Sequence, residues 1–151
     1  MNIFAVDKDP RVAARMLCDK HVVKMILESA QMLKLAHLSI GPWYNHPCSK
    51  WVREGKANYE WLAQHALELC KEYTHRYKKV HSYEKTIIKL IENVPSMRKF
   101  KNNWYSTKFA QAMPDKYKDS SSVLAYRKYY LGEKFSFCRW TNREPPKWFL
   151  S

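Results

Sequence analysis

Four polar side chains share one face of an otherwise apolar stretch between residues 18 and 34. They are His21, Lys24, Glu28 and Gln31. At roughly 100° per residue, a helix places all four within about 80° of one another. Taking a carboxylate, an ammonium and an imidazole out of water is costly unless these groups are paired or used. The stripe is therefore predicted to line an active site or a nucleic-acid groove.

The first three of these side chains can face one pocket, because Glu28 lies two turns beyond His21 with Lys24 between them. A partly buried carboxylate near cations can stay ionised and act as a general base, or stabilise a developing cation. The alternative is structural, since Lys24 and Glu28 have the i,i+4 separation that favours a salt bridge within a helix. Gln31 favours the functional interpretation, because an amide adds hydrogen-bonding reach that an ion pair does not need.

The net charge of the 151-residue chain is +13, which predicts a strongly negative partner. From residue 97 onward there are twelve Lys or Arg against four Asp or Glu, so this stretch supplies eight of the net positive charges. Many aromatic residues are interleaved with them. Cations bind phosphates and flat rings stack on unpaired bases, so we expect DNA as the partner. A membrane partner is not expected, because no long amphipathic basic helix is evident.

Two further segments combine cations with donors or rings. In the first, Arg76 and Lys79 could clamp a phosphate with His75 as a further donor, or Arg76 and Glu72 could form only a surface pair. In the second, residues 126–134, half of the rings could be core and the rest could face nucleic acid. The candidate nucleic-acid-binding residues are Gln31, Arg53, His75, Arg76, Lys79, Arg127, Lys128, Tyr129, Tyr130, Trp140 and Arg143.

The cysteines and histidines argue against a metal site. Four cysteines lie far apart without a C-x-x-C pair, and no H-x-x-x-H or H-E-x-x-H spacing occurs. No signal peptide precedes the first predicted helix, and no apolar run is long enough to span a membrane. We expect free, mostly buried thiols in a reducing cytoplasm, that of the host cell if the protein is phage-encoded, and no cofactor.

The fold is predicted to be all-α, because the chain has only three glycines and long stretches of helical periodicity. We expect a single compact, monomeric domain over residues 1–151, with three or four main helices, an extended apolar segment at 1–6 that threads the core, and an irregular basic C-terminal region. The predicted helices cover 10–38 with a break or kink near Cys18, 56–79, 82–93 and 121–131. Residues 43–54 and 96–120 are predicted to be irregular, and two prolines are expected to prevent a helix over 139–149.

Two motifs resemble those of the phage pyrimidine-dimer DNA glycosylases, also called endonuclease V. The segment from Asp19 to Glu28 resembles the family's Asp-Gln-His…Arg-Glu segment, with the same His-to-Glu separation of seven. The run Tyr126-Arg-Lys-Tyr-Tyr-Leu-Gly-Glu-Lys134 resembles its C-terminal Trp-Tyr-Lys-Tyr-Tyr-Gly segment. The resemblance implies that Glu28 is the catalytic carboxylate and His21 a nearby active-site histidine. It also implies that the α-amine of the N-terminal residue attacks the sugar of double-stranded DNA at a damaged or modified base, forms an imine and nicks the strand by β-elimination.

Two departures from the family's pattern leave the nucleophile open. The family exposes a threonine by removing its methionine, whereas Asn2 normally blocks that removal. Leu27 and Gln31 stand where the family has two arginines. The nucleophile is therefore the Met1 amine, Lys24, or a water activated by Glu28, and the excised base could differ from a pyrimidine dimer. The alternative functions are a non-catalytic basic nucleic-acid-binding protein and a metal-dependent nuclease.

Overall fold

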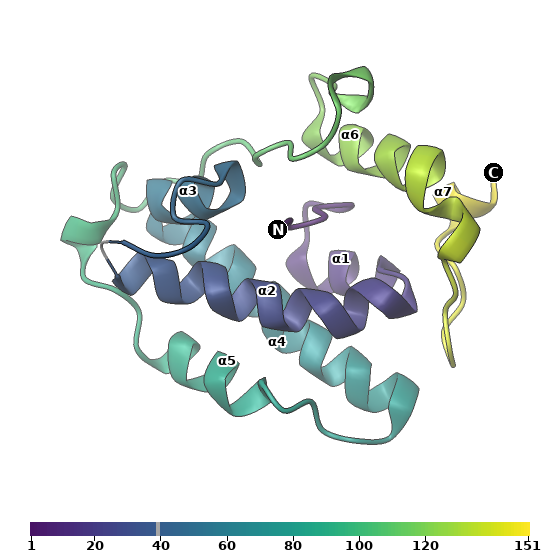
Figure 1. Cartoon of the computed structure of the whole chain (residues 1–151), viewed down its shortest axis with the longest axis horizontal. Coiled ribbons are helices and arrows are strands. Elements are labelled where there is room, and N and C mark those ends of the chain that lie inside the picture. The colour runs from purple at the N-terminus through teal and green to yellow at the C-terminus, as the bar shows by residue number, and fades with distance from the viewer. Residues whose placement is uncertain (39) are drawn as a thin grey trace.

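Helix α4 (Lys56–Tyr77) is the central element of the fold, and four other helices pack against it (Figure 1). The computed structural model describes residues 1–38 and 40–151, and all regular secondary structure within them is helical. The prediction of an all-α fold is confirmed, although these residues form seven α-helices and not three or four main ones. The other six are α1 (Pro10–Met16), α2 (Asp19–His37), α3 (Pro47–Glu54), α5 (Glu84–Glu92), α6 (Ser122–Tyr129) and α7 (Lys147–Leu150).

The start of α1 and the break before α2 follow from local sequence, as predicted. The Asp9 side chain accepts hydrogen bonds from the backbone N–H groups of Arg11 and Val12, and Pro10 occupies the first helical position. Leu17 then leaves the helical conformation with φ −68° and ψ 141°. Helix α2 begins two residues later, so the predicted break near Cys18 is confirmed.

The prediction of an irregular segment over 43–54 was wrong, because α3 occupies its second half. His46 caps this helix, its Nδ1 accepting from the backbone N–H of Cys48 at 3.1 Å, and Pro47 takes the first helical position. Cys48, Trp51 and Val52 recur at helical spacing and are buried. The aromatic and polar composition of the segment concealed this capping signal.

Other boundaries differ from the sequence prediction for local reasons. Helix α4 ends at Tyr77, because Lys78 adopts the left-handed conformation with φ 59°. In α5, Ile88 is exposed although its neighbour Ile87 is buried. The C-terminal tail was predicted to contain no helix, but it ends in α7. This helix starts directly after Pro146, and proline is tolerated at the start of a helix. Residues 96–120 are irregular as predicted, apart from two single 3-10 turns.

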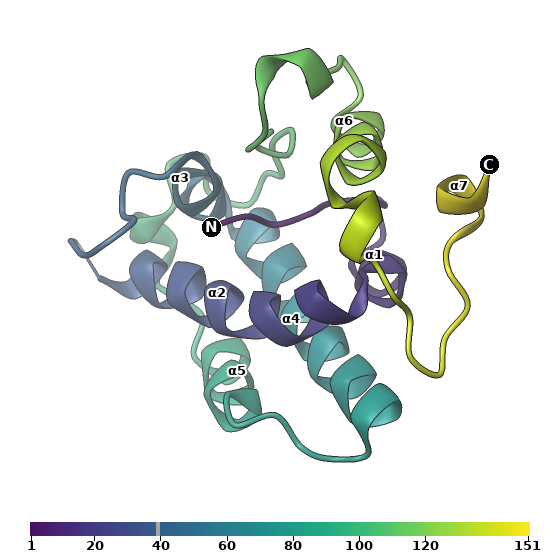
Figure 2. The same cartoon turned by 45° about the vertical axis from the view of Figure 1, so that its right-hand side comes forward.

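Residues 1–6 have no regular secondary structure and run between α2 and α6 before entering α1 (Figure 2). From Ile3 to Val6 they are buried. The Asn2 side chain holds the start of this segment, since its Oδ1 accepts from the N–H groups of Ile3 and Phe4 and its Nδ2 donates to the carbonyl of Ala112. Phe4 has a left-handed backbone, with φ 41°. These contacts fix the position of the first residues relative to α2.

All four cysteines are free and buried, as the sequence predicted. None of the helices in the described ranges is both long and apolar enough to cross a membrane.

The Gly55→Ala substitution tests the close contact between α4 and the segment that covers its first turn. A Cβ at Gly55 would lie 1.8 Å from the backbone oxygen of Tyr105, so the backbone must move. We expect the free energy of unfolding in urea to fall by about 1–3 kcal/mol. Gly41→Ala is the control, because its Cβ would meet only the flexible end of Leu35 at 2.9 Å. Equal losses in the two variants would contradict this interpretation.

Candidate active site

An ion pair between the first residue and α2 forms the centre of the candidate site. The Met1 ammonium lies 3.0 Å from Oε1 of Glu28, and the side chains of these two residues are 2% and 8% exposed. Met1 as a whole is only partly buried, so its accessible surface belongs to its main chain, which includes the amine. The pair therefore places the N-terminal amine against a buried carboxylate.

Lys24 is the second cation at Glu28. Its Nζ lies 3.5 Å from Oε2, and its side chain is 68% exposed. Apart from these two ammonium groups, no hydrogen-bond donor of the described residues reaches either carboxylate oxygen. The predicted salt bridge between Lys24 and Glu28 is present, and Gln31 is exposed further along α2.

His21 holds the N-terminal segment in place. Its ring is buried, stacks on the Phe4 ring with centroids 4.1 Å apart, and shares a hydrogen bond of 2.5 Å through Nδ1 with the hydroxyl of Tyr130. Tyr130, expected as a nucleic-acid contact, is fully buried. No hydrogen bond or ion pair of the described residues joins His21 to Glu28. His21 and Glu28 therefore have different partners, the Phe4 ring and the Tyr130 hydroxyl for His21 and two ammonium groups for Glu28.

Trp43 and His46 lie in the turn before α3, the helix beside which the N-terminus lies (Figures 1 and 2). The pKa of His46 is lowered by its partial burial and by the Met1 ammonium, whereas Glu28 opposes this shift. His46 is thus close enough to feel both charges of the ion pair. The Trp43 ring lies edge-on to His46 with centroids 6.2 Å apart. Sequence reasoning missed His46, although a potential capping residue directly before Pro47 was a readable signal.

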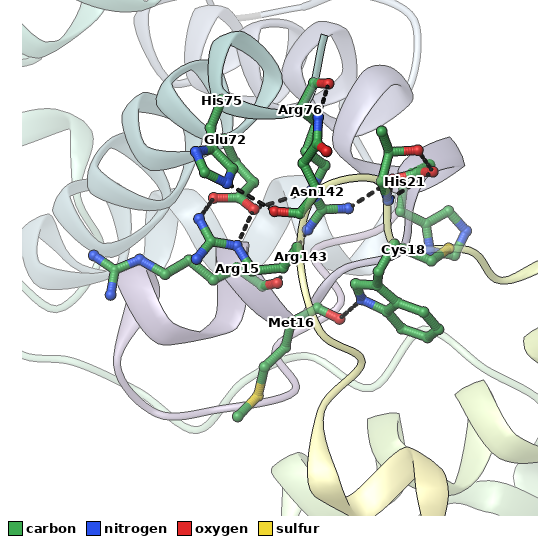
Figure 3. A network of polar contacts seen from close by, with 12 residues as sticks. Arg15, Met16, Cys18, His21, Glu72, His75, Arg76, Asn142 and Arg143 are labelled. Atoms are coloured by element: carbon green, nitrogen blue, oxygen red, sulfur yellow. Dashed lines mark hydrogen bonds and ion pairs between the residues drawn. The ribbon is translucent and has the colours of Figure 1, made fainter.

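Arg76 lies in the interior and not at the surface (Figure 3). Its guanidinium donates to Glu72 Oε1, to Asp19 Oδ1 and to the carbonyl of Arg15, each at 3.0 Å. Burial opposes the ionisation of Glu72, but hydrogen bonds from Arg143 and Arg76 outweigh it and lower the pKa of that carboxyl. The expected phosphate clamp is not formed here, because Arg76 is enclosed by these partners and Lys79 is exposed without it.

The C-terminal tail supplies the other side of this network (Figure 3). Arg143 donates to both oxygens of Glu72, at 2.7 and 2.8 Å. His75 Nε2 donates to the carbonyl of Asn142 at 2.9 Å, and Trp140 Nε1 to the carbonyl of Met16 at 3.0 Å. Three residues expected to bind nucleic acid, His75, Trp140 and Arg143, therefore fasten the tail to α1 and α4.

The aromatic and basic residues of α6 are also engaged within the protein. Arg127 donates from Nε to the carbonyl of Val6 at 2.8 Å. Lys128 pairs with Asp119, and Tyr129 is half-buried against Tyr117. The exposed surface of α6 therefore consists mainly of Leu124, Lys128 and part of Tyr129.

A basic groove of about 470 Å³ lies at the C-terminal half of α3. It is lined by Lys50, Arg53, Glu54, Arg98, Lys99 and Lys101. None of its five cations forms an ion pair within the described ranges, and Glu54 accepts a hydrogen bond from Thr107. Arg53 stacks on the ring of Tyr44 at 3.7 Å. Of the predicted nucleic-acid-binding residues, Arg53 is the one that lines this groove.

Across residues 1–38 and 40–151, no three His, Cys, Asp or Glu side chains are grouped so that they could hold a metal ion.

Comparison with known proteins gives one family match. The model of a family described as pyrimidine dimer DNA glycosylase matches residues 1–85, more than half of the chain. No curated protein and no solved structure gives a significant match.

The Arg76→Met substitution tests the structural role of the buried network. We expect the free energy of unfolding to fall by about 3–5 kcal/mol, because Asp19 loses its ion-pair partner and Glu72 keeps only Arg143 of its two. Lys79→Met, on the exposed residue three positions later, should stay within about 0.5 kcal/mol of the wild type. Urea unfolding followed by circular dichroism measures both, and a wild-type value for Arg76→Met would show that the network contributes nothing.

Proposed function

Because the chain belongs to the pyrimidine dimer DNA glycosylase family, we propose that it removes a damaged or modified base from double-stranded DNA with the Met1 amine as nucleophile, and then nicks the strand at the abasic site. DNA repair by base excision is what family membership implies. The finer proposal is carried by the 3.0 Å contact between the Met1 ammonium and the buried carboxylate of Glu28. An amine beside a general base is the arrangement that covalent catalysis at a sugar carbon requires.

In the first step, Glu28 accepts a proton from the Met1 ammonium, and the resulting lone pair attacks C1′ of the sugar. The bond between C1′ and the base breaks, and the base leaves with the electron pair and takes the proton that Glu28 accepted. The nitrogen then loses a second proton to O4′ as the sugar ring opens between C1′ and O4′, and the nitrogen and C1′ form a protonated imine. The Glu28 carboxylate stabilises the positive charge that develops during these changes.

In the second step, the imine activates the neighbouring carbon. Loss of a proton from C2′ lets a double bond form between C2′ and C3′, and the 3′ phosphate leaves with the electron pair of its bond to C3′. This β-elimination nicks the strand and uses no metal or cofactor. In our proposal Glu28 accepts the C2′ proton, since it stays beside the imine nitrogen.

Met1 is a better candidate for the nucleophile than Lys24. The Met1 side chain is packed in the protein and its amine is held at one position, whereas Lys24 is 68% exposed at the end of a flexible stem. A fixed amine loses less entropy when it attacks. His21 then serves as a positioning residue, since its stacking on Phe4 holds the segment that carries the amine.

Adduct trapping tests the nucleophile. Borohydride reduces an imine to a stable bond, so wild-type protein incubated with an abasic duplex should give a covalent adduct, and mass mapping should locate it at the amine of a retained Met1. Glu28→Gln should lower the trapping rate by at least about 100-fold, as expected for loss of a general base. Duplex binding should be largely kept.

Lys24→Met is the matched control for this experiment, because it removes the other amine at Glu28 and should still be trapped. An adduct on Lys24 would overturn the assignment to Met1. Base release from ultraviolet-damaged DNA without any adduct would instead support the activated-water mechanism. Absence of both activities, with binding intact, would support the non-catalytic alternative.

The basic groove is proposed to bind the phosphates of the DNA strand that reaches the site. Its five unpaired cations can release condensed counterions from DNA, which makes affinity depend on salt. Removing one cation by Arg53→Ala should weaken binding for all sequences, and should reduce the slope of log affinity against log salt by about 1. Lys85→Ala, on the exposed face of α5, should leave the slope unchanged. Fluorescence anisotropy at several salt concentrations measures this, and equal slopes for the wild type and Arg53→Ala would place the DNA elsewhere.

A further inference from the structure

We propose that Trp43 stacks on an unpaired DNA base beside the reacting sugar, so that the turn over residues 43–46 forms one wall of the DNA site. This inference rests on the proposed function and deepens it, because it names a residue that would hold the substrate in an unstacked conformation.

Trp43 is presented to solvent by a defined turn. Its side chain is 58% exposed, and its backbone is left-handed with φ 66°, which is uncommon for a bulky residue. Two backbone hydrogen bonds close the turn, from Tyr44 N–H to the Gly41 carbonyl at 3.1 Å and from His46 N–H to the Trp43 carbonyl at 3.0 Å. Strained backbone of this kind persists where surrounding contacts hold it, and it is concentrated at ligand sites. The turn thus holds a large aromatic ring outside the core.

The turn also lies next to the proposed nucleophile. The His46 ring contacts the edge of Trp43, and it is fixed because its Nδ1 caps α3. The charges of Met1 and Glu28 both act on His46, and the N-terminus lies beside α3 in the two views of the chain (Figures 1 and 2). An unpaired base that neighbours a sugar at the Met1 amine would therefore lie near this turn.

The surroundings of Trp43 favour a nucleic acid over another apolar occupant. The next residue, Tyr44, stacks under Arg53, and Arg53 lines the basic groove. Rings that alternate with cations are the pattern by which proteins hold unpaired nucleotides, with each base on a ring and each phosphate on a cation. A second copy of this chain would bring like charges together, since the groove has five cations and the whole chain a net charge of +13.

The test compares two exposed tryptophans. Trp43→Ala should weaken binding to an abasic duplex about tenfold by fluorescence anisotropy, the effect of losing one stacked base. Because no cation is lost, the slope of log affinity against log salt should not change. Trp43→Phe keeps a ring and should recover most of the affinity. Trp104→Ala is the control, because Trp104 is 64% exposed on another loop, under Lys56, and should bind as the wild type does.

The proposal would be overturned if Trp43→Ala bound the duplex as tightly as Trp104→Ala does. A changed slope of log affinity against log salt would also overturn it, as would a melting temperature of Trp43→Ala well below that of Trp104→Ala. At limiting DNA, borohydride trapping of Trp43→Ala should fall about tenfold with its binding, and trapping at the wild-type rate under these conditions would overturn the proposal. Sedimentation that detects a wild-type dimer abolished by Trp43→Ala would assign the ring to self-association. If wild-type protein binds the duplex but forms no adduct, the proposed reaction fails while the stacking measurement still decides this inference.

Discussion

The position of a charged amine beside a buried carboxylate is the constraint on which the N-terminal half of the structure depends. Burying the Glu28 carboxylate is costly without a cation beside it, and the Met1 ammonium lies against it because residues 2–6 run through the interior. Because this segment is buried and irregular, its backbone N–H and C=O groups need hydrogen-bond partners outside a helix or sheet. The Asn2 side chain satisfies two of its N–H groups, and the stacking of Phe4 on His21 fixes its direction. The polar stripe on α2 therefore has two roles. Glu28 pairs with the amine, and His21 holds the segment that carries it.

The parts of the fold that depend on nearby residues were predictable, and the parts that depend on distant ones were not. The cap at Asp9 and the stripe that contains Glu28 each lie within one helix or at its start, so periodicity and capping rules identified them. The interior position of Arg76 depends on Asp19, 57 residues away, and on Glu72, whose second partner Arg143 is 71 residues further along the chain. A basic residue on a helix is expected at the surface unless its acidic partners are known. A phosphate clamp was therefore predicted at Arg76 and Lys79.

The groups proposed to react and some of the groups that position them come from different parts of the chain. Residues 1–85, which the family match covers, include Met1, Glu28 and the turn before α3. The groups that hold the N-terminal segment from its other side come later, because the Ala112 carbonyl binds Asn2 and the Tyr130 hydroxyl binds His21. Five of the twelve Lys or Arg residues from residue 97 onward form ion pairs within the described part of the chain. The basic groove at α3, with its unpaired cations, is consequently a better candidate for the DNA path than the tail.

The fastening of the tail has a consequence for the order in which the protein matures. Asp19 accepts hydrogen bonds from Thr141, and Glu72 shares its two oxygens between Arg76 and Arg143, so the network stays incomplete until almost the whole chain has left the ribosome. Such distant contacts form late, because the entropy of closing a long loop must be overcome first. A chain released early would keep the Glu28 helix but lack the tail that closes over α1 and α4. Residues 140–143 must therefore be in place before the polar network that joins α1, α2 and α4 is complete.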